Sequence, residues 1–159
     1  MRICLVDYRD PQQADALVRL LDAYACDPAG GGQPLDAEVK RQLPAALAAR
    51  SHAFSVLAFD AQGEPVGLIN CFEGFSTFAC RPLVNVHDVV VLSKARGQGV
   101  AQRMLACVEE EALRRGACKL TLEVLSGNVP ALNAYRRAGF DGYELDPAFG
   151  QAVFLQKKL

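Results

Sequence analysis

Residues 96–101 form a glycine-rich basic turn, Arg-Gly-Gln-Gly-Val-Ala, separated by four residues from the β-branched run at residues 89–91. Gly97 and Gly99 can adopt backbone conformations that other residues avoid, and they let a ligand approach the main chain closely. Where such a turn opens a helix, the first backbone N–H groups have no acceptor inside the helix and can bind an anion. Arg96 adds a fixed positive charge. The pattern therefore predicts a phosphate-binding turn.

The two common nucleotide-binding loops fit this turn poorly. A Walker loop would close with Gly-Lys-Ser/Thr, and the dinucleotide fingerprint would carry a third glycine where Gln102 stands. The sequence therefore predicts a different phosphate-bearing ligand.

A second group of spaced residues follows at residues 128–140, Asn-Val-Pro-Ala-Leu-Asn-Ala-Tyr-Arg-Arg-Ala-Gly-Phe. With Arg-x-x-Gly-x-Ala at residues 96–101, this resembles the two signatures of the GNAT N-acetyltransferase superfamily. Those signatures are Gln/Arg-x-x-Gly-x-Gly/Ala and then Asn-x-x-Ala-x-x-x-Tyr-x-x-x-Gly-Phe. The resemblance is specific from about residue 84 to residue 140, and we expect it to extend over the whole chain.

The resemblance implies acetyl-coenzyme A as cofactor. In that superfamily the first turn holds the pyrophosphate, and the pantetheine arm lies between two central strands that diverge, here residues 83–92 and 119–125. The implied cofactor-binding residues are Val89, Val91, Arg96, Gly97, Gln98, Gly99, Val100, Ala101, Asn128 and Tyr135. Asn128 is also expected to cap the helix that follows it.

The implied reaction is direct attack of a neutral amine on the thioester, without a covalent enzyme intermediate. It requires a group that takes the ammonium proton, a donor to the oxyanion and an acid for the leaving thiolate. Tyr135 occupies the tyrosine position of the signature and is the candidate acid, since a phenol can donate to a thiolate. The alternative is an aromatic side chain that only packs on Phe140. A backbone N–H near Val91 is the simplest oxyanion donor.

Three residues are candidates for the general base. Asp88 is the first choice, acting through a water, because a carboxylate inside a β-branched run needs a partner or a function. Strand alternation predicts that Asp88 shares a face with Val86 and Val90, and that His87 points to the opposite face. A buried Asp88 that is only hydrogen-bonded to neighbouring structure is the alternative. Glu73, on the adjacent strand, could take the proton or bind the substrate ammonium.

An acceptor pocket is predicted before the phosphate strand. Its expected substrate-binding residues are Glu73, Phe75, Thr77 and Phe78. The alternative is that these aromatic side chains belong to the core. The resemblance implies that acceptor specificity lies in residues 25–43 and 143–151, and neither segment carries a motif that names an acceptor.

The elements that must position these residues alternate along the chain. The patterns predict strands at residues 2–6, 53–59, 65–75, 83–92, 119–125 and 152–158, and helices at 11–25, 35–49, 99–115 and 129–138. Pro44 should kink or divide the second helix. The pairs Glu110/Arg114 and Glu111/Arg115 are expected on the exposed side of the third helix.

This order of elements predicts an α+β fold. A single domain over residues 1–159 would hold one mixed, mostly antiparallel sheet with helices on both faces. The resemblance implies the same architecture.

Composition limits the partners and the compartment. The chain has 159 residues, is 51% hydrophobic and carries a formal net charge of −1, which predicts one globular domain without an electrostatic footprint for nucleic acid or a membrane. No apolar run approaches the ~18 residues of a membrane span, and no signal peptide is evident. The 6 cysteines form no metal or redox motif, so we expect reduced thiols in a cytoplasmic protein. The oligomeric state is open, a homodimer being the commonest oligomer.

Two function classes follow from these patterns. The first is an acetyl-coenzyme-A-dependent N-acetyltransferase acting on a small-molecule amine, with a peptide or protein amine as an alternative acceptor. The second is a non-catalytic module that binds acetyl-coenzyme A. The presence of both Tyr135 and Asp88 favours the enzyme.

Overall fold

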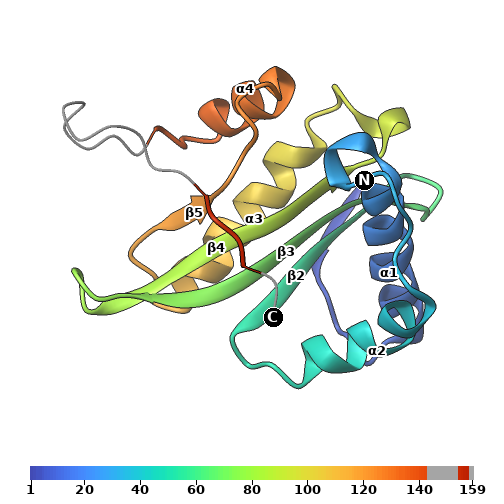
Figure 1. Cartoon of the computed structure of the whole chain (residues 1–159), viewed down its shortest axis with the longest axis horizontal. Helices are drawn as coiled ribbons and strands as arrows, with labels where there is room; N and C mark the ends of the chain where they lie inside the picture. The colour runs from blue at the N-terminus through green and yellow to red at the C-terminus, as the bar shows by residue number, and fades with distance from the viewer. Residues whose placement is uncertain (143–153, 158–159) are drawn as a thin grey trace.

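A computed structural model of the chain describes residues 1–142 and 154–157 (Figure 1). One sheet runs through it in the order β1-β2-β3-β4-β5. The first four strands pair antiparallel with their neighbours, and β5 is parallel to β4. The strands are β1 (Arg2–Leu5), β2 (Ala53–Phe59), β3 (Pro65–Ser76), β4 (Arg81–Val91) and β5 (Leu120–Leu122).

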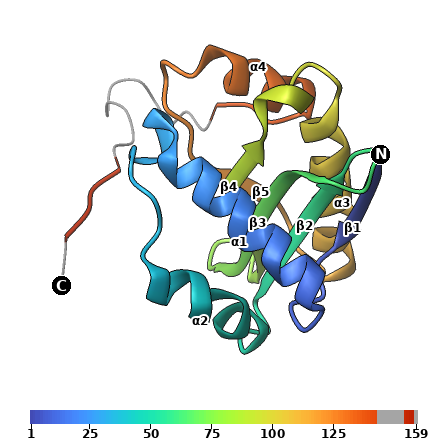
Figure 2. The same ribbon diagram turned by 90° about the vertical axis from the view of Figure 1, so that its right-hand side faces the viewer.

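Helices cover both faces of the sheet, as Figures 1 and 2 show. The α-helices are α1 (Pro11–Cys26), α2 (Ala37–Ala48), α3 (Val100–Arg114) and α4 (Val129–Arg137), with short 3-10 helices η1 (Pro28–Gly30) and η2 (Ser93–Ala95). On one face Met104 and Val108 of α3 pack in a core cluster with Val86, and on the other Leu17 of α1 packs with Val90. The predicted mixed α+β fold is therefore confirmed.

Local side-chain chemistry begins and ends these elements where the sequence predicts. The Asp10 carboxylate accepts the N–H groups of Gln12 and Gln13 and so caps α1. At the β2–β3 turn, the Asp60 carboxylate accepts the N–H of Gln62 at 3.0 Å and that of Glu64 at 2.9 Å. The helix start and the turn are therefore both stabilised by hydrogen bonds to residues close in the sequence.

Two predictions about elements are wrong. Of the kink or division expected at Pro44, the division is wrong, because α2 is continuous from Ala37 to Ala48 and Leu47 beyond the proline packs in the α1-side core. The kink stays a prediction. Of the closing strand expected at residues 152–158, the structure describes 154–157, which are exposed and belong to no strand. Within the described residues they pair with no strand, and alternation alone does not make a strand. The other residues of that segment lie outside the described residues.

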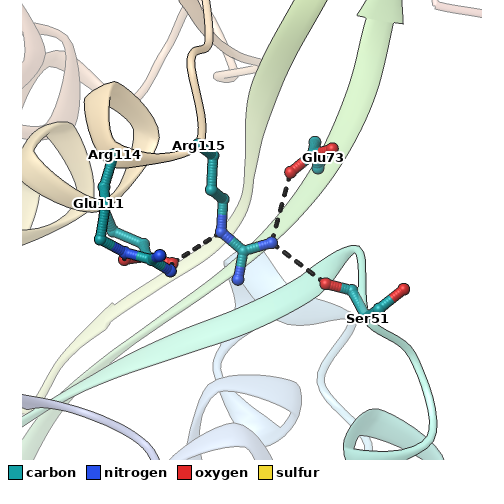
Figure 3. A network of polar contacts seen from close by, with 5 residues as sticks. All are labelled: Ser51, Glu73, Glu111, Arg114 and Arg115. Atoms are coloured by element: carbon teal, nitrogen blue, oxygen red, sulfur yellow. Dashed lines mark hydrogen bonds and ion pairs between the residues drawn. The ribbon is translucent and has the colours of Figure 1, made fainter.

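Arg115 ties the end of α3 to the sheet (Figure 3). Its Nε donates to Glu111 at 2.7 Å, and its Nη1 lies 3.3 Å from Glu73 and 3.1 Å from the carbonyl oxygen of Ser51. Arg114 forms two hydrogen bonds of 2.6 Å with the same Glu111 carboxylate. Glu111 is only 5% exposed, so the expectation that both Glu/Arg pairs lie outside is wrong for this residue. The Glu111 charge is satisfied by Arg114 and Arg115 and not by solvent.

This arrangement predicts acid-sensitive stability. Hydrogen bonds from Arg114, and then from Arg115, hold the pKa of Glu111 below its ordinary value. The folded state thus binds this proton less tightly than the unfolded chain does. The ion pairs are fully stabilising above the unfolded pKa of about 4.3, and their contribution is lost as pH falls through the folded pKa. We expect Glu111→Gln to lower the free energy of unfolding by about 2 kcal/mol at neutral pH, and by much less near pH 3.

Chemical denaturation of both proteins from pH 7 to pH 3 measures this difference. Glu110→Gln is the matched control, because the neighbouring Glu110 is exposed. A Glu111→Gln deficit that stays constant across this range would contradict the prediction.

Candidate functional site

The turn at residues 96–101 has the geometry of an anion-binding loop. Gly97 and Gly99 have φ of 75° and 73°, in the left-handed region that glycine favours. Gly99 is the N-cap of α3 and provides no side-chain acceptor for the first N–H groups of the helix. A Cβ built on either glycine would meet nothing within 4 Å, so the space beside the turn is open. These features fit a phosphate group; that coenzyme A fills the space stays a prediction.

Side-chain contacts hold this turn to the sheet. Arg96 donates from Nε to the carbonyl oxygen of Val91 at 3.0 Å, and its Nη2 lies 3.9 Å from an Asp27 carboxylate oxygen. Gln98 donates to the carbonyl oxygen of Lys94 at 3.0 Å. The position of the Arg96 cation is thereby set by the end of β4.

The strands β4 and β5 part beside this turn. Their pairing ends at Val86 and Leu122, whereas β4 continues to Val91. The strand expected at residues 119–125 is therefore shorter than predicted. Leu92 donates its N–H to Val66 on β3 at 2.9 Å, so backbone alternation turns the N–H of Val91 toward the β5 side. Within the described chain no strand pairs with that edge of β4 at residues 87–91, which is where the pantetheine arm is predicted.

A β-bulge changes the faces of the candidate bases. Asn70 of β3 pairs with Asp88, but the next residue of β3 pairs with Val86, and His87 is left without a partner. The bulge shifts the alternation by one residue. Val86 therefore packs on the α3 side, whereas Val90 packs on the α1 side. The predicted shared face for Asp88, Val86 and Val90 is wrong.

His87 does not point away from Asp88. Its Nδ1 lies 3.3 Å from Oδ1 of Asp88, and its ring meets Phe72 edge-on with 5.4 Å between the ring centroids. Phe72 packs against the α1-side core. The expectation that strand alternation separates the two candidate bases is therefore wrong, since the bulge brings them together.

α4 places Tyr135 near the same region. Asn128 caps this helix by accepting the N–H of Ala131 at 3.3 Å, as predicted. Gln102 of α3 donates to the carbonyl oxygen of Ala134 at 3.5 Å and so connects the two helices. The Tyr135 ring meets Phe140 edge-on at 6.0 Å, which is the packing that the alternative interpretation expected. Among the described residues no hydrogen-bond partner takes up the Tyr135 hydroxyl.

Tyr24 of α1 lies within electrostatic range of both Tyr135 and Asp88. Burial raises the pKa of Tyr24, and the charge of Asp88 raises it further. Burial likewise raises the pKa of Tyr135, with Tyr24 adding to the effect. Both phenols therefore keep their protons at neutral pH. The sequence analysis did not single out Tyr24 as a site residue, because on the helix it reads as one more apolar position.

The segment after α1 is held close to Tyr24. A Cβ on Gly30 would lie 1.9 Å from the Tyr24 carbonyl oxygen, so only glycine fits there. Asp22 accepts the N–H of Leu35 at 2.9 Å and pairs with Lys40 at 2.7 Å. These contacts fix much of the segment 25–43, for which acceptor specificity stays a prediction. The other predicted specificity segment, 143–151, lies outside the described residues.

The predicted acceptor pocket is not brought to this site. Phe75 and Phe78 are 59% and 101% exposed, and with Thr77 they lie at the tip of the long β3–β4 hairpin (Figure 1). That tip is at the opposite end of β4 from Val91, about 30 Å away at the usual rise of a strand. The hairpin is longer than the sequence suggested, and so the aromatic cluster flanks a turn. The Glu73 carboxylate is occupied by Arg115.

The comparison with protein families decides the identity of this fold. The profile of the Acetyltransferase (GNAT) family matches residues 17–140. The chain belongs to this family.

Individual relatives agree with the family. A streptothricin acetyltransferase of Streptomyces lavendulae is 35% identical over 97 residues, which cover 61% of this chain and 49% of that protein. The chain thus spans about half the length of this relative. A crystal structure of a probable acetyltransferase has a TM-score of 0.80 at 21% identity and 99% coverage of both chains. A structure of AAC(6')-Iy with a CoA-containing bisubstrate analog has a TM-score of 0.77 at 14% identity and full coverage of both chains. These structural likenesses show the shared GNAT fold.

The phosphate turn yields a charge test. Gly99→Asp places a carboxylate where phosphate oxygens are predicted, so we expect coenzyme A affinity to fall by about tenfold or more. Gly99→Asn is the matched control, since asparagine has the same shape, carries no charge and tolerates the left-handed region. Calorimetric titration of both folded variants measures the difference. Equal coenzyme A affinities for Asp and Asn at this position would contradict the assignment of the turn.

Proposed function

We propose that this chain is an acetyl-coenzyme-A-dependent N-acetyltransferase whose acceptor is a primary amine of a small molecule. The observation that carries the proposal is the placement of three features around the part of β4 that β5 leaves unpaired. The glycine turn follows the end of β4, Asp88 lies on the same strand, and Tyr135 of α4 packs on the core cluster that Val89 and Val91 also contact. Membership of the GNAT family and the streptothricin relative support an amine acceptor.

The residues present fit the cofactor. The open, left-handed glycines and the uncapped start of α3 suit its pyrophosphate, with Arg96 beside them. The N–H of Val91 on the unpaired edge of β4 suits an amide or carbonyl of the pantetheine arm, and Val89 lies on the same edge. When bound, acetyl-coenzyme A supplies an acetyl group activated as a thioester. The remaining cofactor residues proposed are Gly97, Gln98, Gly99, Val100, Ala101 and Asn128.

The chain's own groups then divide the proton transfers. Asp88 faces the α1 side and binds the acceptor ammonium or takes its proton through a water. Tyr135 keeps its proton because burial raises its pKa, so it can donate to the departing thiolate. The N–H of Val91 can donate to the carbonyl oxygen as it gains charge. No covalent enzyme intermediate is required.

The proposal also concerns compartment and assembly. In the described residues no helix is long and apolar enough to cross a bilayer. All 6 cysteines are free thiols, which suits the reducing environment of the cytoplasm that we propose. A homodimer is the proposed assembly.

A thiol-release screen tests the activity. Acetyl-coenzyme A is offered with a library of small amines, aminoglycosides, amino acids and peptides, and free thiol is measured over time. We expect turnover with a small-molecule amine. Turnover with peptides alone would make the chain a peptide N-acetyltransferase, and coenzyme A binding without any turnover would make it a binding module.

Tyr135→Phe tests the proposed acid. We expect kcat to fall by roughly 10- to 1,000-fold while coenzyme A affinity changes little, because the hydroxyl acts mainly in the transition state. The variant keeps the ring that packs on Phe140, so thermal unfolding should be unchanged. Full activity in this variant would show that Tyr135 only packs.

Asp88→Asn tests the proposed base. We expect the acidic limb of the pH profile of kcat/KM to flatten. Two acceptor amines of different basicity provide the control, because a limb that belongs to the acceptor moves with the amine and a limb that belongs to the protein does not. An acidic limb unchanged by Asp88→Asn would remove this residue from the role.

A further inference from the structure

A row of polar side chains crosses the sheet beneath α1 and ends on Asp88. Tyr8, in the loop after β1, lies with its hydroxyl 2.8 Å from Oγ of Ser55 on β2. Ser55 donates to Oδ1 of Asn70 on β3 at 2.6 Å, and Nδ2 of Asn70 donates to Oδ2 of Asp88 on β4 at 3.0 Å. Ser55 is 1% exposed and Asn70 4% exposed. The row therefore runs through the interior from the first loop to the candidate base.

The register of the strands aligns these side chains in a row. Ser55 is the direct cross-strand partner of Asn70, and Asn70 is the direct partner of Asp88. The second pairing exists only because of the bulge at His87, since regular alternation would align Asn70 with a different residue. The bulge and the row are thus parts of one arrangement.

The donors and acceptors of this row can be assigned in only one way. Ser55 has a single hydroxyl hydrogen, which it gives to Asn70, so Tyr8 must be the donor to Ser55. Burial raises the pKa of Tyr8, which keeps that hydrogen in place at neutral pH. Turning the Asn70 amide over would set its oxygen against the Asp88 carboxylate. Every donor in the row therefore points toward Asp88.

Stability alone gives no reason for this row. Ser55 and Asn70 lie on the face of the sheet where Leu57, Leu68 and Val90 form the core under α1. Replacing both partners of a buried hydrogen bond with apolar groups of similar shape is nearly neutral for folding. A fully bonded polar row does, however, fix one orientation of its members. Here the member at the end of the row is the candidate base.

We propose that Tyr8, Ser55 and Asn70 are positioning residues, which hold the Asp88 carboxylate in one orientation for the acceptor amine. This inference rests on the proposed function. The row orients the carboxylate and does not conduct protons, because the Asn70 amide does not release a proton under physiological conditions. Oδ2 is held by Asn70, and Oδ1 is left toward His87. An ammonium group or a water that reaches Oδ1 therefore shares this oxygen with the His87 imidazole.

Among the described residues, His87 is the basic side chain that contacts Asp88, with Nδ1 3.3 Å from Oδ1. The titratable groups nearest to it in the described chain are His87 on its own strand, Tyr24 on α1 and Cys71 on β3. Burial, with Asp88 adding to it, raises the pKa of the Cys71 thiol, and the Tyr24 phenol is likewise neutral at pH 7. No lysine or arginine among the described residues pairs with Asp88. The donor from Asn70 therefore fixes the carboxylate without adding a positive charge.

Asn70→Leu tests the inference, with Asn85→Leu as the matched control. Asn85 lies on β4 and donates to Thr121 at 3.2 Å, outside the row. The protonation midpoint of Asp88 is followed by carbon-13 NMR of its carboxyl group in the free protein, which requires no acceptor. We expect this midpoint to rise by about one pH unit in Asn70→Leu and to stay constant in Asn85→Leu, because only the first loses a donor to the carboxylate.

Ser55→Ala is a milder second variant that keeps the test open if Asn70→Leu does not fold. It frees the Asn70 amide to turn, so we expect a smaller rise in the same direction. Unchanged midpoints in the folded variants would overturn the inference.

Enzyme assays separate this inference from the proposed function. With an accepted amine, we expect the acidic limb of kcat/KM to move with the NMR midpoint, and kcat/KM near neutral pH to fall by about tenfold in Asn70→Leu, with coenzyme A affinity unchanged. A midpoint that moves while the limb stays fixed would overturn the positioning role, and it would also show that Asp88 is not the base. If the acidic limb is lost in Asp88→Asn but does not move in Asn70→Leu, the positioning inference is overturned and Asp88 keeps its role as the base.

Discussion

The unequal pairing of β4 is the constraint on which the site depends. β3 pairs with β4 along nearly all of its length, which makes the strand rigid, whereas β5 pairs with it only from Val84 to Val86. A strand that is held on one side can leave the N–H and C=O groups of its other side exposed without losing its shape. Those groups would be a liability on an ordinary edge strand. Here they lie beside the glycine turn, where a ligand with amide groups can pair with them.

The bulge at His87 determines which residues of this rigid strand face α1 and which face α3. Val89 and Val91 lie half-buried on the α3 side, while Asp88 turns to the α1 side and meets Asn70. Cofactor contacts and proton transfer can therefore come from neighbouring residues of one strand. The bulge interrupts the regular hydrogen-bond ladder between β3 and β4. The buried row from Tyr8 to Asp88 fixes the position of the bulge, because Asn70 meets Asp88 only in the shifted register.

The sequence predicted what local chemistry determines. The glycine turn, the Asn128 cap and the Asp60 turn each depend on a few adjacent residues, and all lie where the patterns put them. The face of Asp88 could not be predicted, because alternation assumes an unbroken ladder and a bulge carries no signal in one strand. A polar residue within each of two apolar strands, Ser55 and Asn70, was the available clue. The Glu111/Arg115 pair was predicted from its spacing, but its burial was not, because i,i+4 spacing is the same for exposed and buried pairs.

Opposite charges are kept apart along β4, and this separation is what a transfer between an anionic cofactor and a cationic acceptor requires. Arg96 is tethered to the Val91 carbonyl oxygen and lies near Asp27, so its guanidinium does not reach back to Asp88. Asp88 in turn is held by Asn70 on the other face of the strand. Had the two met, an ion pair would have neutralised both the Arg96 guanidinium and the Asp88 carboxylate. Arg96 is held by the Val91 carbonyl oxygen and Asp88 by the Asn70 amide, so the two opposite charges do not neutralise each other.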